Sequence, residues 1–352
     1  MTDERARFAD AIHTNARQWA QDGSHFYGVL AGHIADDVAA GGPCWPVLKA
    51  HSEHPLEQVP GIRLLGGVHR FVLSGRAPEL AAHYQSVGGD GDAEAAWPHF
   101  RALVEQHADE LAKWVDHVPQ TNEVGRSIAL VGAWLVAAAE TGLPLRLLEP
   151  GCSAGLNLRA DHYWYEQDGV GVGDPASAVR FVDRWEGRRP PLEAWTRIAD
   201  RRGCDRFPID AGSEEGRLTL LSYVWPDERE RFDTLAHALA AASDLPVAID
   251  RSGACEWLER ELAVLPDGKA TVVYHSYFWM YLDDHDRACL TRVLADAGDR
   301  ATATAPLVHI SLEAAPGADY AHSELRIRSW PGGDERLLGT CLVHPHTVQW
   351  LV

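Results

Sequence analysis

The segment best suited to chemistry is the glycine-containing run Glu149-Pro150-Gly151-Cys152-Ser153-Ala154-Gly155. Glycines at 151 and 155 permit a tight turn and let the backbone approach a ligand closely. If a strand precedes the turn and a helix follows it, the helix amides can bind a carboxylate or a phosphate. Glu149 can accept hydrogen bonds from the same ligand. The spacing therefore predicts a ligand-binding loop.

The same letters also read Gly-x-Ser-x-Gly, the nucleophile elbow of an α/β-hydrolase. Chain order would then allow Ser153, Asp250 and either His275 or His309 as a catalytic triad. Two observations count against this alternative: the residues before the loop look helical, and no His-Gly-Gly run supplies an oxyanion hole. A third alternative is a domain that binds a ligand at this loop without catalysis.

A second group of candidates follows the predicted strand that ends near residue 275. His275 can act as a general base because the ordinary pKa of histidine lies near neutrality. Tyr277, Trp279 and Tyr281 can wall a substrate, although aromatic residues here are equally typical of a core. Asn157, just after the glycine loop, is polar enough to meet a ligand, and solvation of the surface explains it as well.

The elements that would position these residues change character near residue 120. From the start to about residue 141, apolar residues recur at helical spacing, with breaks at Gly41-Gly42-Pro43 and Gly88-Gly89-Asp90-Gly91. This region is predicted to be all helical, including one helix over Trp97 to Val118. The run from Ile128 to Ala139 is almost entirely apolar, which predicts a buried helix.

That buried helix leads into Leu145 to Glu149, predicted to be the first strand of a parallel sheet. Counted from Glu123 to Thr141, the helix is roughly 28 Å long, whereas the five-residue strand is roughly 17 Å. Running antiparallel to the strand, the helix overhangs it and places Asn122, Glu123 and Arg126 beside the glycine loop. Alternatively, Glu123 and Arg126 cap the helix and pair with each other.

Strands and helices then alternate to the end of the chain. A helix is predicted to begin near Gly155 or Leu156, and a polar excursion fills about 166 to 195. The further predicted elements are a strand ending at Asp205, a helix over 227–242, a strand over 246–250, a helix over 254–264, a strand over 271–275, a helix over 284–297, and strands over 307–312, 324–330 and 336–343. This pattern predicts an α/β sheet with an antiparallel strand near one edge.

Composition limits the partners. With 46% hydrophobic and 24% charged residues, the chain is typical of a globular protein. The formal net charge of −19 would repel phosphate backbones, so we expect no nucleic-acid partner and favour a small-molecule substrate. No stretch is expected to span a membrane. The oligomeric state stays open.

The six cysteines are far apart in the sequence and form no C-x-x-C pair. This spacing argues against a disulfide framework and against a cysteine zinc site. We therefore expect reduced thiols and a cytoplasmic location. We expect no metal, since the histidines lack ligand companions at helical spacing.

The glycine loop resembles the first motif of the class I S-adenosylmethionine-dependent methyltransferases, an acidic residue followed by glycines at alternate positions. Here the motif is Glu149-x-Gly151-x-Ser153-x-Gly155, with serine in place of the middle glycine. The resemblance implies S-adenosylmethionine or S-adenosylhomocysteine as the cofactor. It also implies an acid on the ribose after the second strand, for which Asp205 is the candidate, and an acid beside the adenine after the third, here Asp250.

Four further segments resemble a bacterial family of uncharacterised proteins known as a domain of unknown function. They are Gln120 to Arg126, Gly151 to Leu158, Tyr223-Val224-Trp225-Pro226-Asp227 and Trp330-Pro331-Gly332-Gly333. We therefore expect a helical cap domain over 1–120 and a Rossmann-like, methyltransferase-type α/β domain over 121–352. The sheet should be mostly parallel, with an antiparallel hairpin at its carboxyl-terminal end.

Overall fold

The structure is a computed structural model that describes residues 2–53, 55–194, 197–315 and 322–352. The chain forms two compact units. The helical unit comprises Met1–Thr121 and Ser213–Ala236, and the sheet unit comprises Asn122–Gly212 and His237–Val352. The predicted boundary near residue 120 placed everything after it with the sheet. Ser213–Ala236 packs with the helices instead.

The helical unit contains only helices among its described residues. They are α1 (Thr2–Gln21), α2 (His25–Ala40), α3 (Cys44–Leu48), η1 (Lys49–His51), α4 (Pro55–Gln58), α5 (Pro60–Leu73), α6 (Pro78–Ala81), η2 (Gln85–Val87), α7 (Ala93–Gln106), α8 (Ala108–Val115), α10 (Glu214–Ser222) and most of α11 (Arg229–Ala242). Capping residues determine where these helices begin and end. In α2, the Ser24 side chain accepts a hydrogen bond from the Tyr27 amide, and Gly41 ends the helix with a φ of 77°.

Two features of the helical unit differ from the sequence expectation. The single helix predicted over Trp97 to Val118 is wrong: α7 ends at Gln106 and α8 starts at Ala108, because His107 leaves the helical region with φ −118° and ψ 28°. The second difference is the segment Ser213–Ala236, which His69 of α5 helps to hold in this unit. His69 is fully buried, and its Nδ1 lies 3.2 Å from the carbonyl oxygen of Ser222.

The sheet unit is built on nine strands in the order β5-β12-β11-β10-β9-β8-β1-β6-β7. Their bounds are β1 (Leu145–Pro150), β5 (Trp185–Gly187), β6 (Ile198–Asp205), β7 (Ala248–Arg251), β8 (Ala270–Ser276), β9 (Leu307–Ala314), β10 (His322–Trp330), β11 (Glu335–Leu342) and β12 (Val348–Trp350). The five strands from β7 to β9 are mutually parallel, while β9 to β12 pair antiparallel. The predicted mixed α/β class and mostly parallel sheet are confirmed.

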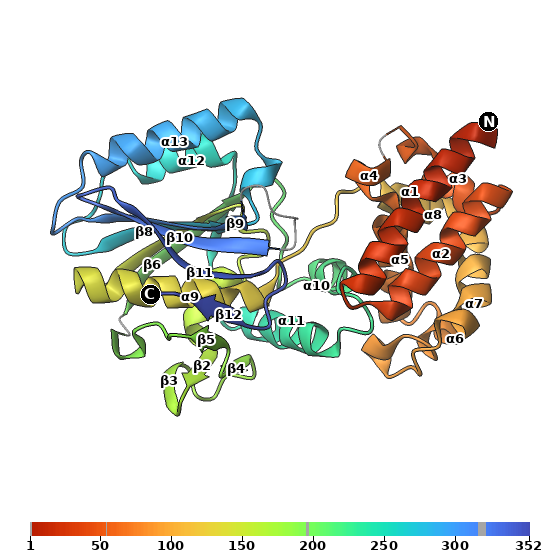
Figure 1. The fold of residues 1–352 in the computed structure, drawn as a ribbon, viewed down its shortest axis with the longest axis horizontal. Helices are drawn as coiled ribbons and strands as arrows, with labels where there is room; N and C mark the ends of the chain where they lie inside the picture. The colour runs from red at the N-terminus through yellow and green to blue at the C-terminus, as the bar shows by residue number, and fades with distance from the viewer. Residues whose placement is uncertain (1, 54, 195–196, 316–321) are drawn as a thin grey trace. The chain divides into compact units, whose positions relative to one another are not determined.

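Helices cover both faces of this sheet (Figure 1). Helix α9 (Ser127–Thr141) packs on one face, where Trp134 makes an edge contact with Tyr274 of β8. Helices α12 (Ala254–Glu261) and α13 (Asp284–Gly298) cover the other face, around a core that includes Leu148, Val273 and Trp330. We call these the α9 face and the α13 face.

The predicted polar excursion over 166–195 contains a second, smaller sheet. Strands β2 (Trp164–Gln167), β3 (Val170–Gly173) and β4 (Arg180–Val182) form it in the order β3-β2-β4, and the following β5 joins the large sheet beside β12. Residue 195, the end of the predicted excursion, lies outside the described residues.

One helix bears on the expectation that no stretch spans a membrane. The stretch Val124–Thr141 is long and apolar enough to cross a bilayer. However, 83% of that stretch is buried inside the protein, so its apolar surface is already covered by α9's own neighbours. The composition is that of a core helix, as predicted for this segment.

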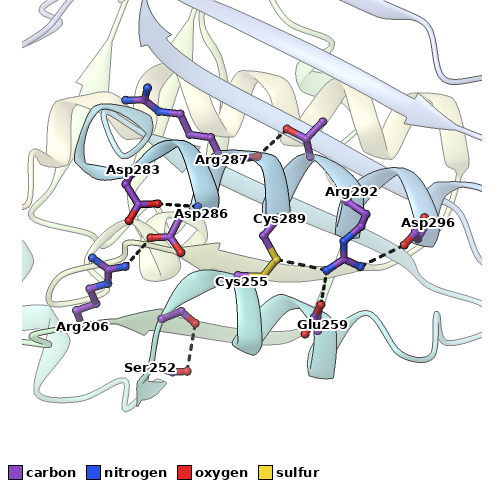
Figure 2. The surroundings of a disulfide bond; sticks show 12 residues. Arg206, Ser252, Cys255, Glu259, Asp283, Asp286, Arg287, Cys289, Arg292 and Asp296 are labelled. Carbon is purple, nitrogen blue, oxygen red and sulfur yellow. Dashed lines mark hydrogen bonds and ion pairs between the residues drawn. A yellow bond between two sulfur atoms is a disulfide. The ribbon is translucent and has the colours of Figure 1, made fainter.

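The expectation that all six cysteines are reduced is also wrong. Cys255 of α12 and Cys289 of α13 form a disulfide, with Cα atoms 6.0 Å apart (Figure 2). The pair is 34 residues apart in sequence, and only the packing of the two helices brings it within bridging distance. The other four cysteines are free.

Candidate functional site

The glycine loop lies where the strand order reverses. From β1 the chain proceeds through β6 and β7 on one side and through β8 and β9 on the other. In open α/β sheets, ligands bind outside the carboxyl ends of the strands at such a switch point. The loop Gly151–Gly155 follows the carboxyl end of β1 directly, so it stands at this position.

Both glycines are required by the turn. Gly151 and Gly155 have φ values of 71° and 67°. A Cβ at residue 151 would lie 2.3 Å from Cδ2 of Phe278, and one at residue 155 would lie 2.9 Å from Cδ1 of Ile249. Ser153 between them also has a positive φ, 52°, which costs a non-glycine residue about 1–3 kcal/mol.

The backbone amides of the loop are largely used within the protein. The amides of Gly151 and Cys152 both donate to the carbonyl oxygen of Cys204, and the Ser153 amide donates to Oδ2 of Asp205. The Gly155 amide donates to the carbonyl oxygen of Cys152, and the Leu156 amide donates to Oδ1 of Asn122. The predicted α-helix after the loop is also wrong, since a short 3₁₀ helix, Asn157–His162, stands there. Ligand contacts therefore fall to side chains rather than to amides.

Glu149 is the most perturbed acid at the switch point. Its side chain is only 3% exposed, and burial raises the pKa of the carboxyl from 4.5 to about 8. The hydroxyl of Tyr274 donates to Oε2 of Glu149 at 3.2 Å, which partly opposes this rise. A buried acid held largely neutral at a ligand crevice is typical of functional sites.

Two polar atoms beside this acid have no partner among the described residues. The Ser153 Oγ and the Asn157 Oδ1 are both buried without a hydrogen bond. The Asn157 amide nitrogen donates to the carbonyl oxygen of Glu123 at 3.3 Å. Both atoms can therefore still accept a hydrogen bond from a ligand.

Asp205 shares this site, whereas Asp250 does not. The Asp205 carboxylate accepts from the Ser153 amide at 2.9 Å and from the Phe207 amide at 2.8 Å. Asp250 instead accepts from Arg202, from the Trp257 indole and from Arg260. It thus points to the α13 face, where its charge is offset, and is separated from Glu149 and Asp205.

The segment just before the buried helix meets the loop. The predicted helix start at Glu123 is early, because a 3₁₀ turn, Val124–Arg126, comes first and α9 begins at Ser127. Asn122 and Glu123 bond to Leu156 and Asn157, and the Glu123 carboxylate lies 3.0 Å from Nδ1 of His344. Arg126 is 8% exposed and donates to the carbonyl oxygen of Val343 at 3.1 Å. Its guanidinium also lies 4.4 Å from the ring centre of Tyr277.

His275 and Tyr281 stand apart from this group. Adjacent strand residues point to opposite faces, so His275 faces α13 while Tyr274 reaches Glu149 on the α9 face. His275 Nδ1 lies 2.7 Å from Oε1 of Glu313, and its Nε2 lies 3.1 Å from Nε2 of His309. Tyr281 is 59% exposed at the end of the following loop.

The alternative triad is not assembled. The Ser153 hydroxyl has no hydrogen-bond partner among the described residues, so no histidine activates it there. Both ring nitrogens of His275 are engaged elsewhere, and Asp250 binds two arginines. The positive φ of Ser153 is the one property that it shares with a nucleophile elbow.

Sequence reasoning missed two residues that the structure makes important. Tyr274 was not among the predicted site residues, and its bond to Glu149 has no sequence signal. Glu313 follows His309 and Ser311 at every second residue of β9. That period-2 polar pattern in a central strand could have been noticed, because a buried strand face seldom carries three polar residues.

Comparison with known proteins gives one match. The model of the family described as uncharacterised protein conserved in bacteria, domain of unknown function 2332, matches residues 9–350. No curated protein and no solved structure matches the chain. With nearly its whole length matched, the chain belongs to this family of uncharacterised bacterial proteins, DUF2332.

Proposed function

We propose that the protein is a methyltransferase-like enzyme that uses S-adenosylmethionine and a small-molecule acceptor. The observation that carries the proposal is Glu149, a buried acid with a pKa raised to about 8 at the switch point of the sheet. The parallel order β7-β6-β1-β8-β9 supports it, since it corresponds to the order 3-2-1-4-5 of doubly wound nucleotide-binding sheets.

The residues present fit a nucleoside through side chains. Ser153 Oγ and Asn157 Oδ1 are orphaned buried polar atoms, and Glu149 can donate a proton when neutral. Asp205 has one amide on each oxygen and keeps further lone pairs for ribose hydroxyls. When bound, the cofactor supplies an activated methyl group.

The protein's share of such a reaction is positioning, with help from a group that accepts the acceptor's proton. Glu123 borders the glycine loop through Asn157, and Arg126 donates to the carbonyl oxygen of Ser276 at the end of β8; we assign both to orienting the acceptor. His275, predicted as a general base, lies within β8 and faces α13, and Tyr281, predicted to wall the substrate, lies in the turn after that strand, so we assign neither to this site. Asp250, predicted beside the adenine, is assigned a structural role with its arginines.

The test is calorimetric titration of the full chain with S-adenosylmethionine and with S-adenosylhomocysteine. We expect both to bind the wild type, and Asp205→Asn to bind about 10–100-fold more weakly through loss of a charged hydrogen bond. Asp183→Asn is the matched control, because Asp183 also accepts a backbone amide but lies in the turn after β4. It should bind as the wild type does.

Three outcomes would overturn the proposal. If neither compound binds, the cofactor assignment fails. If both bind but no methylated product appears across a broad acceptor panel, the protein is a nucleoside-binding protein without catalysis. If a fluorophosphonate labels the wild type and not Ser153→Ala, the positive φ of Ser153 reflects a nucleophile elbow and the protein is a hydrolase.

A further inference from the structure

A cleft of about 300 Å³ opens on the α13 face, away from Glu149. Its floor is formed by strands β8, β9 and β10, and one wall is the edge of α13. The lining residues are His275, Trp279, Thr291, Leu294, Ala295, His309, Ser311, Glu313, Arg328, Trp330 and Glu335. This volume lies at the lower end of the range for small-molecule pockets, about 300–1,000 Å³.

Strand pairing explains why polar groups converge here. His309, Ser311 and Glu313 occupy alternate positions of β9 and therefore share one face. In the register of the sheet, Arg328 of β10 stands opposite His309, and His275 of β8 stands opposite Ser311. Three strands thus contribute to one polar floor.

A hydrogen-bonded chain runs from Glu313 to the cleft. Glu313 Oε1 accepts from the amides of Phe278 and Trp279, at 3.0 and 3.2 Å, and from Nδ1 of His275. His275 Nδ1 therefore carries a proton, and the Nε2–Nε2 contact with His309 holds one more. Burial, with smaller contributions from His275 and Arg328, lowers the pKa of His309 to about 3, so this ring is neutral.

The placement of these protons leaves Nδ1 of His309 for a ligand. With the shared proton on Nε2 of His309, Nε2 of His275 accepts it, and Nδ1 of His309 is then a hydrogen-bond acceptor. No residue in the described part of the chain bonds to this Nδ1. The cleft thus contains a ring nitrogen whose orientation Glu313 and His275 fix in advance.

Arg328 supplies the charge. Its Nε donates to the carbonyl oxygen of Gly333 at 2.7 Å, and its guanidinium lies 4.8 Å from the ring centre of Trp330. No carboxylate within the described ranges pairs with Arg328, whereas the neighbouring Arg326 pairs with Glu324 and Glu335. The negative charge of Glu313 is stabilised by the three N–H groups that donate to its Oε1.

The remaining walls are apolar and planar. Trp279 stacks on His275 at an interplanar angle of 19°, and Trp330 is 8% exposed. Leu294 and Ala295 of α13 close the side toward the helix. Such walls favour a flat, apolar ligand body.

We propose that this cleft binds a small aromatic carboxylate. The carboxylate pairs with Arg328, the ring lies between the indoles of Trp279 and Trp330, and a hydroxyl on the ring donates to Nδ1 of His309. One guanidinium beside two acidic residues favours a singly charged carboxylate over a doubly charged phosphate. This inference does not depend on the cofactor proposed above, because the two sites lie on opposite faces of the sheet.

The test is calorimetric titration of the full chain, without cofactor, with benzoate, 4-hydroxybenzoate and benzamide. We expect 4-hydroxybenzoate to bind most tightly, benzoate next, and uncharged benzamide at least tenfold more weakly than benzoate. Arg328→Gln should weaken benzoate binding at least tenfold. Arg292→Gln is the matched control, since Arg292 lies on α13 but pairs with Glu259 beside the disulfide.

A second variant tests the histidine separately. His309→Phe should remove the preference for 4-hydroxybenzoate over benzoate and leave benzoate binding within about threefold. Thermal melting of each variant checks that it folds. The proposal is overturned if neither carboxylate binds, if benzamide binds as well as benzoate, or if a folded Arg328→Gln binds benzoate as the wild type does.

Discussion

The glycine loop and the α13-face cleft use polar groups in opposite ways. At the loop, four of its backbone amides, the amide of Leu156 after it and both Asp205 oxygens are occupied by partners inside the protein. In the cleft, Arg328 has no carboxylate partner within the described residues, and a histidine nitrogen is left for a ligand. The loop is visible in the sequence as a motif, while the cleft is assembled from three strands. A motif that is recognisable in the sequence can therefore serve only to form the turn. Ligand contacts can come from residues that form no recognisable motif.

If the loop is built for stability and the cleft for binding, substitutions in the two regions should affect different measurements. The largest expected effect is on Glu149, whose pKa is about 8 in the folded protein against an ordinary 4.5. Below pH 4.5 Glu149 is protonated in both the folded and the unfolded state, and its full contribution to the free energy of unfolding is present. As the pH rises through 8 the contribution is lost, at most roughly 5 kcal/mol.

Glu149→Gln should remove that loss, because the amide resembles the protonated acid. The free energy of unfolding from urea titrations at several pH values checks this, with the exposed Glu193→Gln as control. The wild type and Glu193→Gln should lose stability between pH 4.5 and 8, while Glu149→Gln should not. Parallel pH profiles for all three proteins would contradict the prediction.

The disulfide comes next and connects stability to the cleft. Closing a loop of 34 residues stabilises a protein by about 4 kcal/mol in the chain-entropy description. The double variant Cys255→Ser with Cys289→Ser should lose up to that amount, measured by urea unfolding under oxidising conditions. It should also bind benzoate a few-fold more weakly, since α13 forms a wall of the cleft. Cys341→Ser, which alters a free cysteine, is the control.

Gly151→Ala should destabilise by about 2–4 kcal/mol, since it combines a positive φ with a Cβ 2.3 Å from Phe278. Gly169→Ala is the matched control, because its φ of 77° is similar and no atom lies within 4 Å of the added Cβ. It should cost only about 1–2 kcal/mol. Equal losses in the two variants would mean that the packing of Phe278 on the loop contributes nothing.

The smallest effect on stability is expected for Arg328→Gln. Its side chain is exposed and pairs with no carboxylate among the described residues, so losing the bond to Gly333 and the contact with Trp330 should lower the free energy of unfolding by no more than about 1 kcal/mol. Its effect on benzoate binding should nevertheless be the largest of any variant here. A loss of stability above 2 kcal/mol with unchanged binding would reverse the contrast between the two regions.

Much of the fold follows from local sequence patterns. Strands β1, β8 and β9 and helix α13 begin and end within two residues of their predicted bounds, and helix α9 ends as predicted at Thr141. Their positions were predictable because their apolar runs are long and end at glycine, proline or acidic caps. The short strands β2 to β5 and β12 were missed. Each has three or four residues and pairs with distant segments, as when Trp185 meets Val348, which no local pattern encodes.

The candidate site was predictable only where geometry is local. Asn122 and Glu123 lie beside the loop as predicted, although they precede α9 rather than belong to it, and Arg126 bonds to Val343 and Ser276 instead. The separation of His275 and Asp250 from Glu149 was not anticipated. It depends on which face of the sheet each side chain enters, and that is decided by tertiary partners such as Glu313 and Arg202.

The position of α9 also determines when the protein can fold. This helix is complete at Thr141, yet it packs on β8, β9 and β10, and β10 begins only at His322. At a synthesis rate of about 5–20 residues per second, the nascent chain would wait on the order of ten seconds or more before those strands emerge. Contacts of such long sequence separation also slow refolding. During that interval the apolar helix must be shielded, so folding of this chain should depend strongly on chaperones.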